Sequence, residues 1–262
     1  MVRTRCLALA NARMDYIVFG RGKRPLILIQ GLGTRGIRGS AAMVAWMYRC
    51  FARDYRVYLF DRRQGALEGV TVRALATDVA AAMDALGLAH AHVLGVSQGG
   101  MIAQELAIGR PELVDRLVLA VTLARSNATV EDVIHRWITL TEQGDMRALI
   151  ADMLDRMYSD AYKGRYRPLL PLLTLLQTPK EPQRFAALAR ACLTCDAYDR
   201  LDRIACPVLV IGGRQDRIVT GEASEEIAGR LGCALYMYEA LGHAAYEEAA
   251  DFNRRVLDFF AG

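Results

Sequence analysis

The sequence predicts an α/β fold in which helices flank a mostly parallel central sheet, with a helical cap inserted late in the chain. Three observations lead to this prediction. Short β-branched runs alternate with segments of helical periodicity over the first 124 residues. The strand pattern then stops for about 80 residues and resumes at Cys206-Pro207. The 262 residues are enough for one large core that carries such an insertion.

The first part of the chain supplies most of the predicted core. Residues 7–10 and 14–19 alternate loosely and are expected to form strands. The run at 25–29 ends in glycines, as a buried parallel strand does. Further strands are predicted at 56–60, 92–96 and 117–121, and helices at 41–51, 72–86 and 98–108. This alternation indicates βαβ units and therefore a parallel sheet.

The segment from Arg125 to Arg203 contains no convincing strand and is predicted to form the cap. Thr129-x-x-Asp132 fits a capping box that starts its first helix. Helices are expected at 130–143, 145–160, 168–177 and 182–197, and the core resumes with a strand at 207–211, a helix at 223–231, a strand at 234–238 and a helix at 249–260. The predicted core therefore comprises residues 1–124 and 204–262, and the cap comprises residues 125–203. A cap in this place covers the edge where open α/β sheets bind ligands.

Composition and charge exclude several classes of protein. A net charge of +4 is too small to predict a nucleic-acid partner. No apolar run approaches the roughly 18–20 residues that cross a bilayer, and the apolar stretch after Arg5 is shorter than a signal sequence needs. The six cysteines are dispersed and predict buried free thiols rather than disulfides or a zinc site. We expect a cytoplasmic protein without a membrane partner.

The segment Gly95-Val-Ser97-Gln-Gly99 lies between a predicted strand and a predicted helix. The pattern G-x-S-x-G in this setting is typical of a nucleophile elbow, where a sharp turn lifts the serine above the sheet. Glycines are needed on both sides because a Cβ would collide with the neighbouring elements. The sequence therefore predicts Ser97 as a nucleophile.

A serine nucleophile needs a histidine base, which follows it in the chain order of such sheets. The four histidines are His90, His92, His135 and His243. The first two precede Ser97 and the third lies in the predicted cap, so His243 is the candidate. It follows the strand at 234–238, at the carboxyl edge of the sheet. His90 and His92 have no third ligand nearby, and a metal site is not expected.

The base in turn needs an acid that orients it. Asp216 follows the strand at 207–211 and stands between serine and histidine in the chain, as expected. Asp61 precedes the serine and is expected to hold a turn. The developing oxyanion requires two backbone N–H donors. We expect these donors from Gln98, directly after the serine, and from Leu32 in the glycine-rich turn after the strand at 25–29.

With these motifs, the chain resembles the α/β-hydrolase superfamily of serine hydrolases over nearly its whole length. The resemblance is strongest at residues 95–104, 207–216 and 242–243. Residues 31–34 and 97–101 are similar to the enol-lactonase branch. The resemblance implies the α/β-hydrolase fold. The chain departs from it at Gln30, where members usually have histidine, and at Gln64-Gly-Ala, where a Gly-His-Gly turn is usual.

The predicted reaction is hydrolysis of a carboxylic ester or lactone through an acyl-enzyme, with no metal or organic cofactor. The substrate is expected to be a small, mostly apolar molecule. Cap residues that are candidates for its pocket, or simply for the core of the cap, are Trp137, Tyr158, Tyr162 and Leu169. C–C bond hydrolysis, amide cleavage and acyl transfer use the same triad and stay open as alternatives. A ligand receptor without turnover is a further alternative, although it would not need all three groups.

One competing motif is Gly31-Leu-Gly33-Thr-Arg-Gly36, which matches the G-x-G-x-x-G dinucleotide fingerprint after a strand. Asp54 lies at a distance along the chain that fits a ribose contact. However, Ile37-Arg-Gly39 is a poor start for the helix that the fingerprint requires. Nucleotide binding would also leave the Ser–Asp–His order unexplained, so the hydrolase interpretation is favoured.

Overall fold

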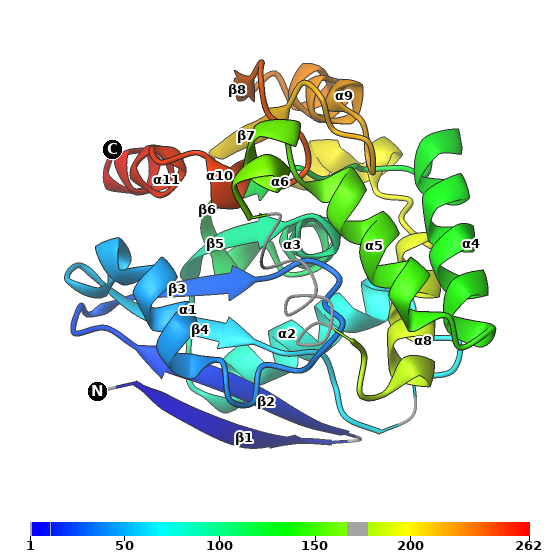
Figure 1. Cartoon of the computed structure of the whole chain (residues 1–262). Helices are drawn as coiled ribbons and strands as arrows, with labels where there is room; N and C mark the ends of the chain where they lie inside the picture. Colours follow the sequence, from blue (N-terminus) through cyan, green and yellow to red (C-terminus); the bar gives the residue numbers. More distant parts are fainter. Residues whose placement is uncertain (1, 11, 66, 167–177) are drawn as a thin grey trace.

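An eight-stranded sheet forms the centre of the molecule in the computed structural model, which describes residues 2–10, 12–65, 67–166 and 178–262 (Figure 1). The strands are β1 (Arg3–Leu9), β2 (Ala12–Phe19), β3 (Arg24–Ile29), β4 (Tyr55–Phe60), β5 (Ala91–Val96), β6 (Val114–Ala120), β7 (Val208–Gly213) and β8 (Ala234–Tyr238). Their spatial order is β1-β2-β4-β3-β5-β6-β7-β8. Only the β1–β2 and β2–β4 pairs are antiparallel. The predicted mostly parallel α/β sheet is therefore confirmed.

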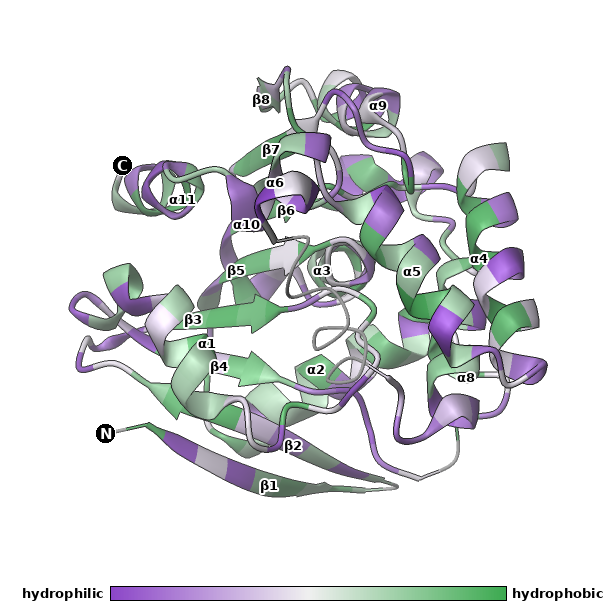
Figure 2. Ribbon diagram, viewed as in Figure 1, coloured by the Kyte–Doolittle hydropathy of each residue, from purple (hydrophilic) through white to green (hydrophobic). Residues whose placement is uncertain are grey.

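The inner strands are apolar on both faces because helices cover both sides of the sheet. In β3, Leu26 and Leu28 belong to one apolar cluster, and Ile27 and Ile29 belong to the other. This alternation follows from the two-residue period of a strand. Figure 2 shows β3 as largely hydrophobic, whereas the edge strand β1 mixes polar and apolar residues.

The helices that flank the sheet divide between these two clusters. The flanking helices are α1 (Ala41–Met47), α2 (Val72–Ala85), α3 (Gln98–Gly109), α9 (Gly221–Leu231), α10 (Ala245–Glu248) and α11 (Phe252–Ala261). The buried apolar side chains of α2, α3 and α9 belong to one cluster, and those of α1 and α11 to the other. None of the described helices is long and apolar enough to cross a membrane.

Two of the predicted helices that flank the sheet are shorter in the structure because each is interrupted. The helix expected at 41–51 ends at Met47 and continues as a 3₁₀ turn, Arg49–Ala52, which carries the fully buried Phe51. The helix expected at 249–260 is preceded by α10 and begins only at Phe252, because Ala249 is extended. The sequence pattern identified the apolar faces but not these breaks.

Between β6 and β7 lies a helical segment, which we call the α4–α8 segment. Its described helices are α4 (Ala128–Glu142), α5 (Met146–Met157), α6 (Asp160–Tyr166) and α8 (Pro182–Cys192). These helices gather beside the edge to which β3 and β4 point (Figure 1). The helix expected at 168–177 lies outside the described residues. The helix expected at 182–197 ends at Cys192.

The capping box predicted at Thr129 and Asp132 is wrong. Helix α4 begins two residues earlier, with Asn127 as its N-cap, and the Asn127 side chain accepts the N–H of Val130 at 2.9 Å. The Asn127 amide also donates to the backbone oxygen of Val219 at 3.0 Å. This second contact crosses to the loop after β7, and no local sequence pattern indicates it.

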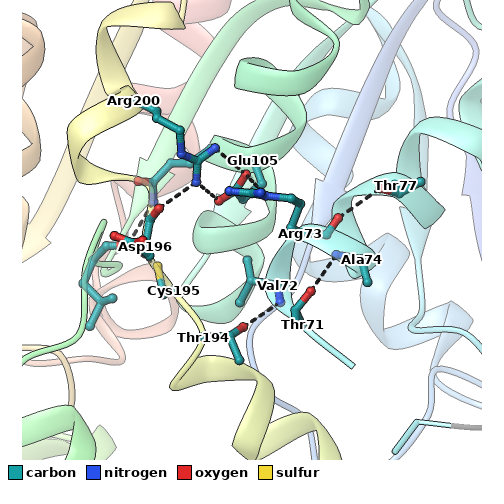
Figure 3. A network of polar contacts seen from close by, with 12 residues as sticks. Thr71, Val72, Arg73, Ala74, Thr77, Glu105, Thr194, Cys195, Asp196 and Arg200 are labelled. Carbon is teal, nitrogen blue, oxygen red and sulfur yellow. Dashed lines mark hydrogen bonds and ion pairs between the residues drawn. The ribbon is translucent and has the colours of Figure 1, made fainter. Parts of the chain in front are cut away.

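The return from α8 to β7 is joined firmly to the core (Figure 3). Arg200 donates to the buried Glu105 of α3 at 3.0 Å, and Thr194 accepts the N–H of Val72 at 3.0 Å. The N–H of Ala197 donates to the oxygen of Ala124 at 2.7 Å. These contacts place the last part of the α4–α8 segment against α2, α3 and the loop after β6.

Candidate active site

Ser97 lies at a sharp turn between β5 and α3. Its backbone has φ 53° and ψ −122°, a strained conformation for a residue with a side chain. A Cβ on Gly95 would lie 2.5 Å from the oxygen of Gly99, and one on Gly99 would lie 1.9 Å from the oxygen of Ile29. Both glycines are thus required by close backbone contacts. The geometry is that of the predicted nucleophile elbow.

Two loops at the carboxyl edge of the sheet bring an acid and a base to this serine. His243 Nε2 lies 3.0 Å from Ser97 Oγ, and His243 Nδ1 lies 2.7 Å from Asp216 Oδ2. Asp216 Oδ1 accepts the N–H groups of Ile218 and Val219 at 2.8 and 3.0 Å. The histidine and aspartate are buried, so water does not compete strongly for these contacts. The fold therefore brings together all three residues expected from their chain order.

The two expected oxyanion donors belong to two segments that adjoin the serine. Gln98 is the first residue of α3, so its N–H has no acceptor within the helix. Leu32 lies in the loop after β3 and lines the same cavity as Ser97. A Cβ on Gly31 would lie 3.2 Å from the Cβ of Ser97, which shows how closely this loop approaches the nucleophile.

A narrow cavity of about 40 Å³ opens above Ser97 and His243. Most of its lining is apolar: Leu32, Met101, Val130, Ile134, Trp137, Met153, Met157, Ile218 and Val219, together with Gly31, Cys192 and Tyr246. Trp137 thus lies where it was expected. Tyr158 and Tyr162 do not line the described cavity, because they stack on each other at 4.7 Å and Tyr158 donates to Glu247. Leu169 lies outside the described residues.

The glycine-rich loop after β3 does not have the geometry of a dinucleotide site. Helix α1 begins only at Ala41, five residues after Gly36. Between them, the N–H of Ile37 donates to Asp61 Oδ2 at 3.0 Å. A carboxylate here would repel a phosphate. Asp61 therefore holds this turn, as expected. Over the described part of the chain, no cluster of three metal-ligating side chains is found.

Comparison with known proteins agrees with this geometry. The model of the alpha/beta hydrolase family matches residues 26–255, which is most of the chain. The chain belongs to the alpha/beta hydrolase family. The solved enol-lactonase of Burkholderia xenovorans LB400 shares its fold, with a TM-score of 0.87 at 24% identity over 98% of this chain and 100% of the other.

Curated relatives of this alpha/beta hydrolase carry several different names. A protein of Mycobacterium tuberculosis, provisionally named non-heme bromoperoxidase BpoC, is 30% identical over 90% of this chain and 94% of its own length. A 2-hydroxy-6-oxononadienedioate/2-hydroxy-6-oxononatrienedioate hydrolase of Paraburkholderia xenovorans is 25% identical over 96% of this chain and 91% of its own length. The family and a hydrolase activity are thus supported, while the substrates differ.

Behind the nucleophile, this hydrolase has a buried polar network that the sequence did not predict. Arg62 is 5% exposed and donates from Nε to Gln98 Oε1 at 3.1 Å. Gln98 Nε2 donates to the oxygen of Leu188 at 2.6 Å and to Cys192 Sγ at 3.1 Å. Burial lowers the pKa of Arg62 to about 10 and raises the pKa of Cys192 to about 11. At neutral pH, Arg62 is therefore charged and the thiol is neutral.

The loops that carry Asp216 and His243 contact the last turn of α5. The N–H of Ala244 donates to the oxygen of Met157 at 2.9 Å. Arg217, next to the acid, lies 3.5 Å from the carboxylate of Asp155. Helix α5 therefore adjoins the acid and base, whereas α8 adjoins the residue after the nucleophile. No sequence motif marks either set of contacts.

Proposed function

We propose that the protein is a serine hydrolase that cleaves a carboxylic ester or lactone of a small, mostly apolar substrate. The observation that carries this proposal is the hydrogen-bonded series Asp216–His243–Ser97, with contacts of 2.7 and 3.0 Å beside an apolar cavity. An aspartate that holds the imidazole, which in turn reaches a strained serine, is the arrangement that makes a hydroxyl nucleophilic.

In the proposed reaction, Ser97 Oγ attacks the carbonyl carbon while His243 Nε2 takes its proton. The N–H groups of Leu32 and Gln98 bind the resulting oxyanion. His243 then gives the proton to the leaving oxygen, and the ester bond breaks to leave an acyl-enzyme. Water attacks this intermediate with His243 again as base, which releases the acid and restores the serine.

The lining of the cavity supports an uncharged substrate. None of its lining residues within the described part of the chain is an aspartate, glutamate, lysine or arginine. The Paraburkholderia relative is named for a dienedioate, whose two carboxylates would each need a cationic or strongly polar partner. Ester or lactone cleavage is therefore the better proposal than C–C hydrolysis of such a dicarboxylate. We further propose that residues 125–203 act as the cap that selects the substrate.

Labelling with a fluorophosphonate probe tests the nucleophile. We expect wild-type protein to be labelled at Ser97 and to hydrolyse p-nitrophenyl butyrate, and Ser97→Ala to lose both properties, with kcat falling by at least about 10⁴-fold. Ser126→Ala is a matched control, because the Ser126 hydroxyl is buried and has no hydrogen-bond partner among the residues that the structure describes. Esterase activity that persists in Ser97→Ala would contradict the proposal. Esters of increasing chain length and a series of lactones would then define the substrate.

A further inference from the structure

The buried guanidinium of Arg62 plays no part in the proposed proton transfers, yet it lies directly behind the nucleophile. It comes two residues after β4 and is 5% exposed. Its Nε donates to the side chain of Gln98 at 3.1 Å, and its Nη2 donates to the backbone oxygen of Gln30 at 2.5 Å. A buried cation loses its hydration, so it is retained in a fold only where such partners compensate for that loss.

The two partners of Arg62 belong to the two segments that carry the oxyanion donors. Gln98 supplies one donor from its own backbone. Gln30 begins the loop that supplies the other donor, Leu32, two residues further on. The two segments also touch directly, since a Cβ on Gly99 would lie 2.6 Å from the oxygen of Gln30. Movement of either segment would therefore alter the separation of the two donors.

From this geometry we infer that Arg62 is a positioning residue for the oxyanion hole, an inference that rests on the serine-hydrolase function proposed above. Its planar guanidinium presents donors in a fixed fork, so it joins the Gln30 carbonyl and the Gln98 side chain at a set distance. The distance matters because an oxyanion hole acts only when both donors point at the oxygen in the transition state.

Helix α8 fixes the Gln98 end of this connection. The Gln98 amide uses its carbonyl for Arg62 and its NH₂ for Leu188 and Cys192, so the side chain cannot rotate without losing all three contacts. Arg184, also on α8, donates to the backbone oxygens of Arg62 and Arg63 at 3.0 and 2.6 Å. Arg62 is thus held at both its backbone and its side chain.

The test compares Arg62→Met with Arg200→Met. Arg200 also binds a buried group of α3, the carboxylate of Glu105, but within the described residues no hydrogen bond joins it to Gln30 or Gln98. We expect Arg62→Met to lower kcat for p-nitrophenyl butyrate by about 10- to 100-fold, less than the loss of a whole donor, with KM changed less than about 3-fold. Arg200→Met should lower Tm while kcat stays within about 2-fold of wild type.

A trifluoromethyl ketone provides a readout specific to the oxyanion. Ser97 Oγ adds to its carbonyl carbon, the serine proton passes to His243, and the carbonyl oxygen becomes an oxyanion in the hole. The inhibition constant should rise in Arg62→Met by the same factor by which kcat/KM falls. Arg62→Lys, which keeps the charge but lacks the fork, should give a smaller loss in the same direction.

Wild-type kcat in a folded Arg62→Met, or an equal fall of kcat in Arg200→Met, would overturn the inference. If Arg62→Met does not fold, Arg62→Lys and Gln98→Met are measured in its place. An unchanged affinity of both variants for the ketone would likewise overturn the inference. Failure of the wild-type protein to label or to hydrolyse any ester would instead refute the proposed function, so the two failures are distinct.

Discussion

Helices α5 and α8 both contact the candidate active site, but they do so in different ways. Helix α8 reaches the nucleophile side through buried groups, and the side chains of its Arg184 and of the facing Asp61 are only 17% and 11% exposed. Helix α5 adjoins the acid and base at its last turn. There the side chain of Asp155 is 59% exposed, and that of its ion-pair partner Arg217, in the loop after β7, is 51% exposed. The same inserted segment thus has one deeply anchored side and one partly solvated side.

This difference in burial between the α8 and α5 contacts fits two different requirements of the proposed reaction. The oxyanion donors must be fixed before the substrate arrives, because preorganisation is what makes them effective. The apolar cavity must admit a substrate, although its present volume is only about 40 Å³. Exposed ion pairs contribute little stability, whereas buried charge-assisted hydrogen bonds contribute more. We therefore expect α5 to adjust on substrate entry while α8 stays in place.

The largest expected effect is chemical and concerns the acid beside α5. Asn at position 216 can still accept the N–H groups of Ile218 and Val219, but its NH₂ would then face His243 Nδ1 and favour the wrong tautomer. We expect Asp216→Asn to lower kcat by about 10⁴-fold with little change in substrate binding. Asp115→Asn is the matched control, since Asp115 lies 2.7 Å from His90 Nδ1 away from the site. An unchanged kcat in Asp216→Asn would exclude this residue as the acid.

The next largest effect is on stability, and it tests whether α8 is anchored more strongly than α5. Arg184→Met removes two hydrogen bonds from a cation of α8 and should lower the free energy of unfolding by about 2 kcal/mol. Arg217→Met removes an exposed ion pair beside α5 and should lower it by less than about 1 kcal/mol. Urea denaturation followed by circular dichroism measures both. Equal losses would show that the two helices are anchored alike.

The smallest expected effect concerns pH and the contact between α4 and α5. Asp152 accepts Trp137 Nε1, Arg136 Nε and Arg156 Nε, each at 2.8 Å. Burial raises the pKa of Asp152, but these three hydrogen bonds outweigh it, and the pKa lies below its ordinary value of 3.8. The group therefore contributes stability that is present above pH 3.8 and is lost as the pH falls through the lowered pKa.

Thermal unfolding between pH 6 and pH 2.5 checks this expectation. Below about pH 4 the Tm of wild-type protein should fall more steeply than that of Asp152→Asn, which has no carboxylate to protonate at this position. Asp258→Asn, at an exposed ion pair of α11, is the control and should follow the wild type. Parallel curves for wild type and Asp152→Asn would rule out this contribution.

The sequence predicted that Ser97, Asp216 and His243 meet, because chain order and strand ends determine which loops lie together. Ser97, Asp216 and His243 each follow a strand of one parallel sheet, so their loops share an edge. The strand at 234–238 was predicted with the bounds that the structure has. These features depend on local patterns and on simple topology, which a single sequence contains.

The features of the site that were not predicted depend on contacts between segments far apart in the chain. The Arg62–Gln98 contact joins residues 36 positions apart, and neither residue type nor spacing marks it. Trp137 lines the described cavity, whereas Tyr158 and Tyr162 do not, because packing between segments decides which way each of these side chains points. The N-cap residue of α4 was also predicted wrongly. Asn127 takes this position, and its side chain also binds Val219, which is distant in the chain.

The cavity lining has a consequence for laboratory evolution. Five of the lining side chains, Val130, Ile134, Trp137, Met153 and Met157, come from α4 and α5, and none of them is among the described hydrogen-bond partners of Arg62 and Gln98. A combinatorial library restricted to these five codons would change the size and shape of the accepted acyl group while leaving the catalytic apparatus intact. Randomising Leu188 or Cys192 instead would disturb the support of Gln98. We therefore expect substitutions of these five residues to change substrate range with less effect on turnover than substitutions around Gln98.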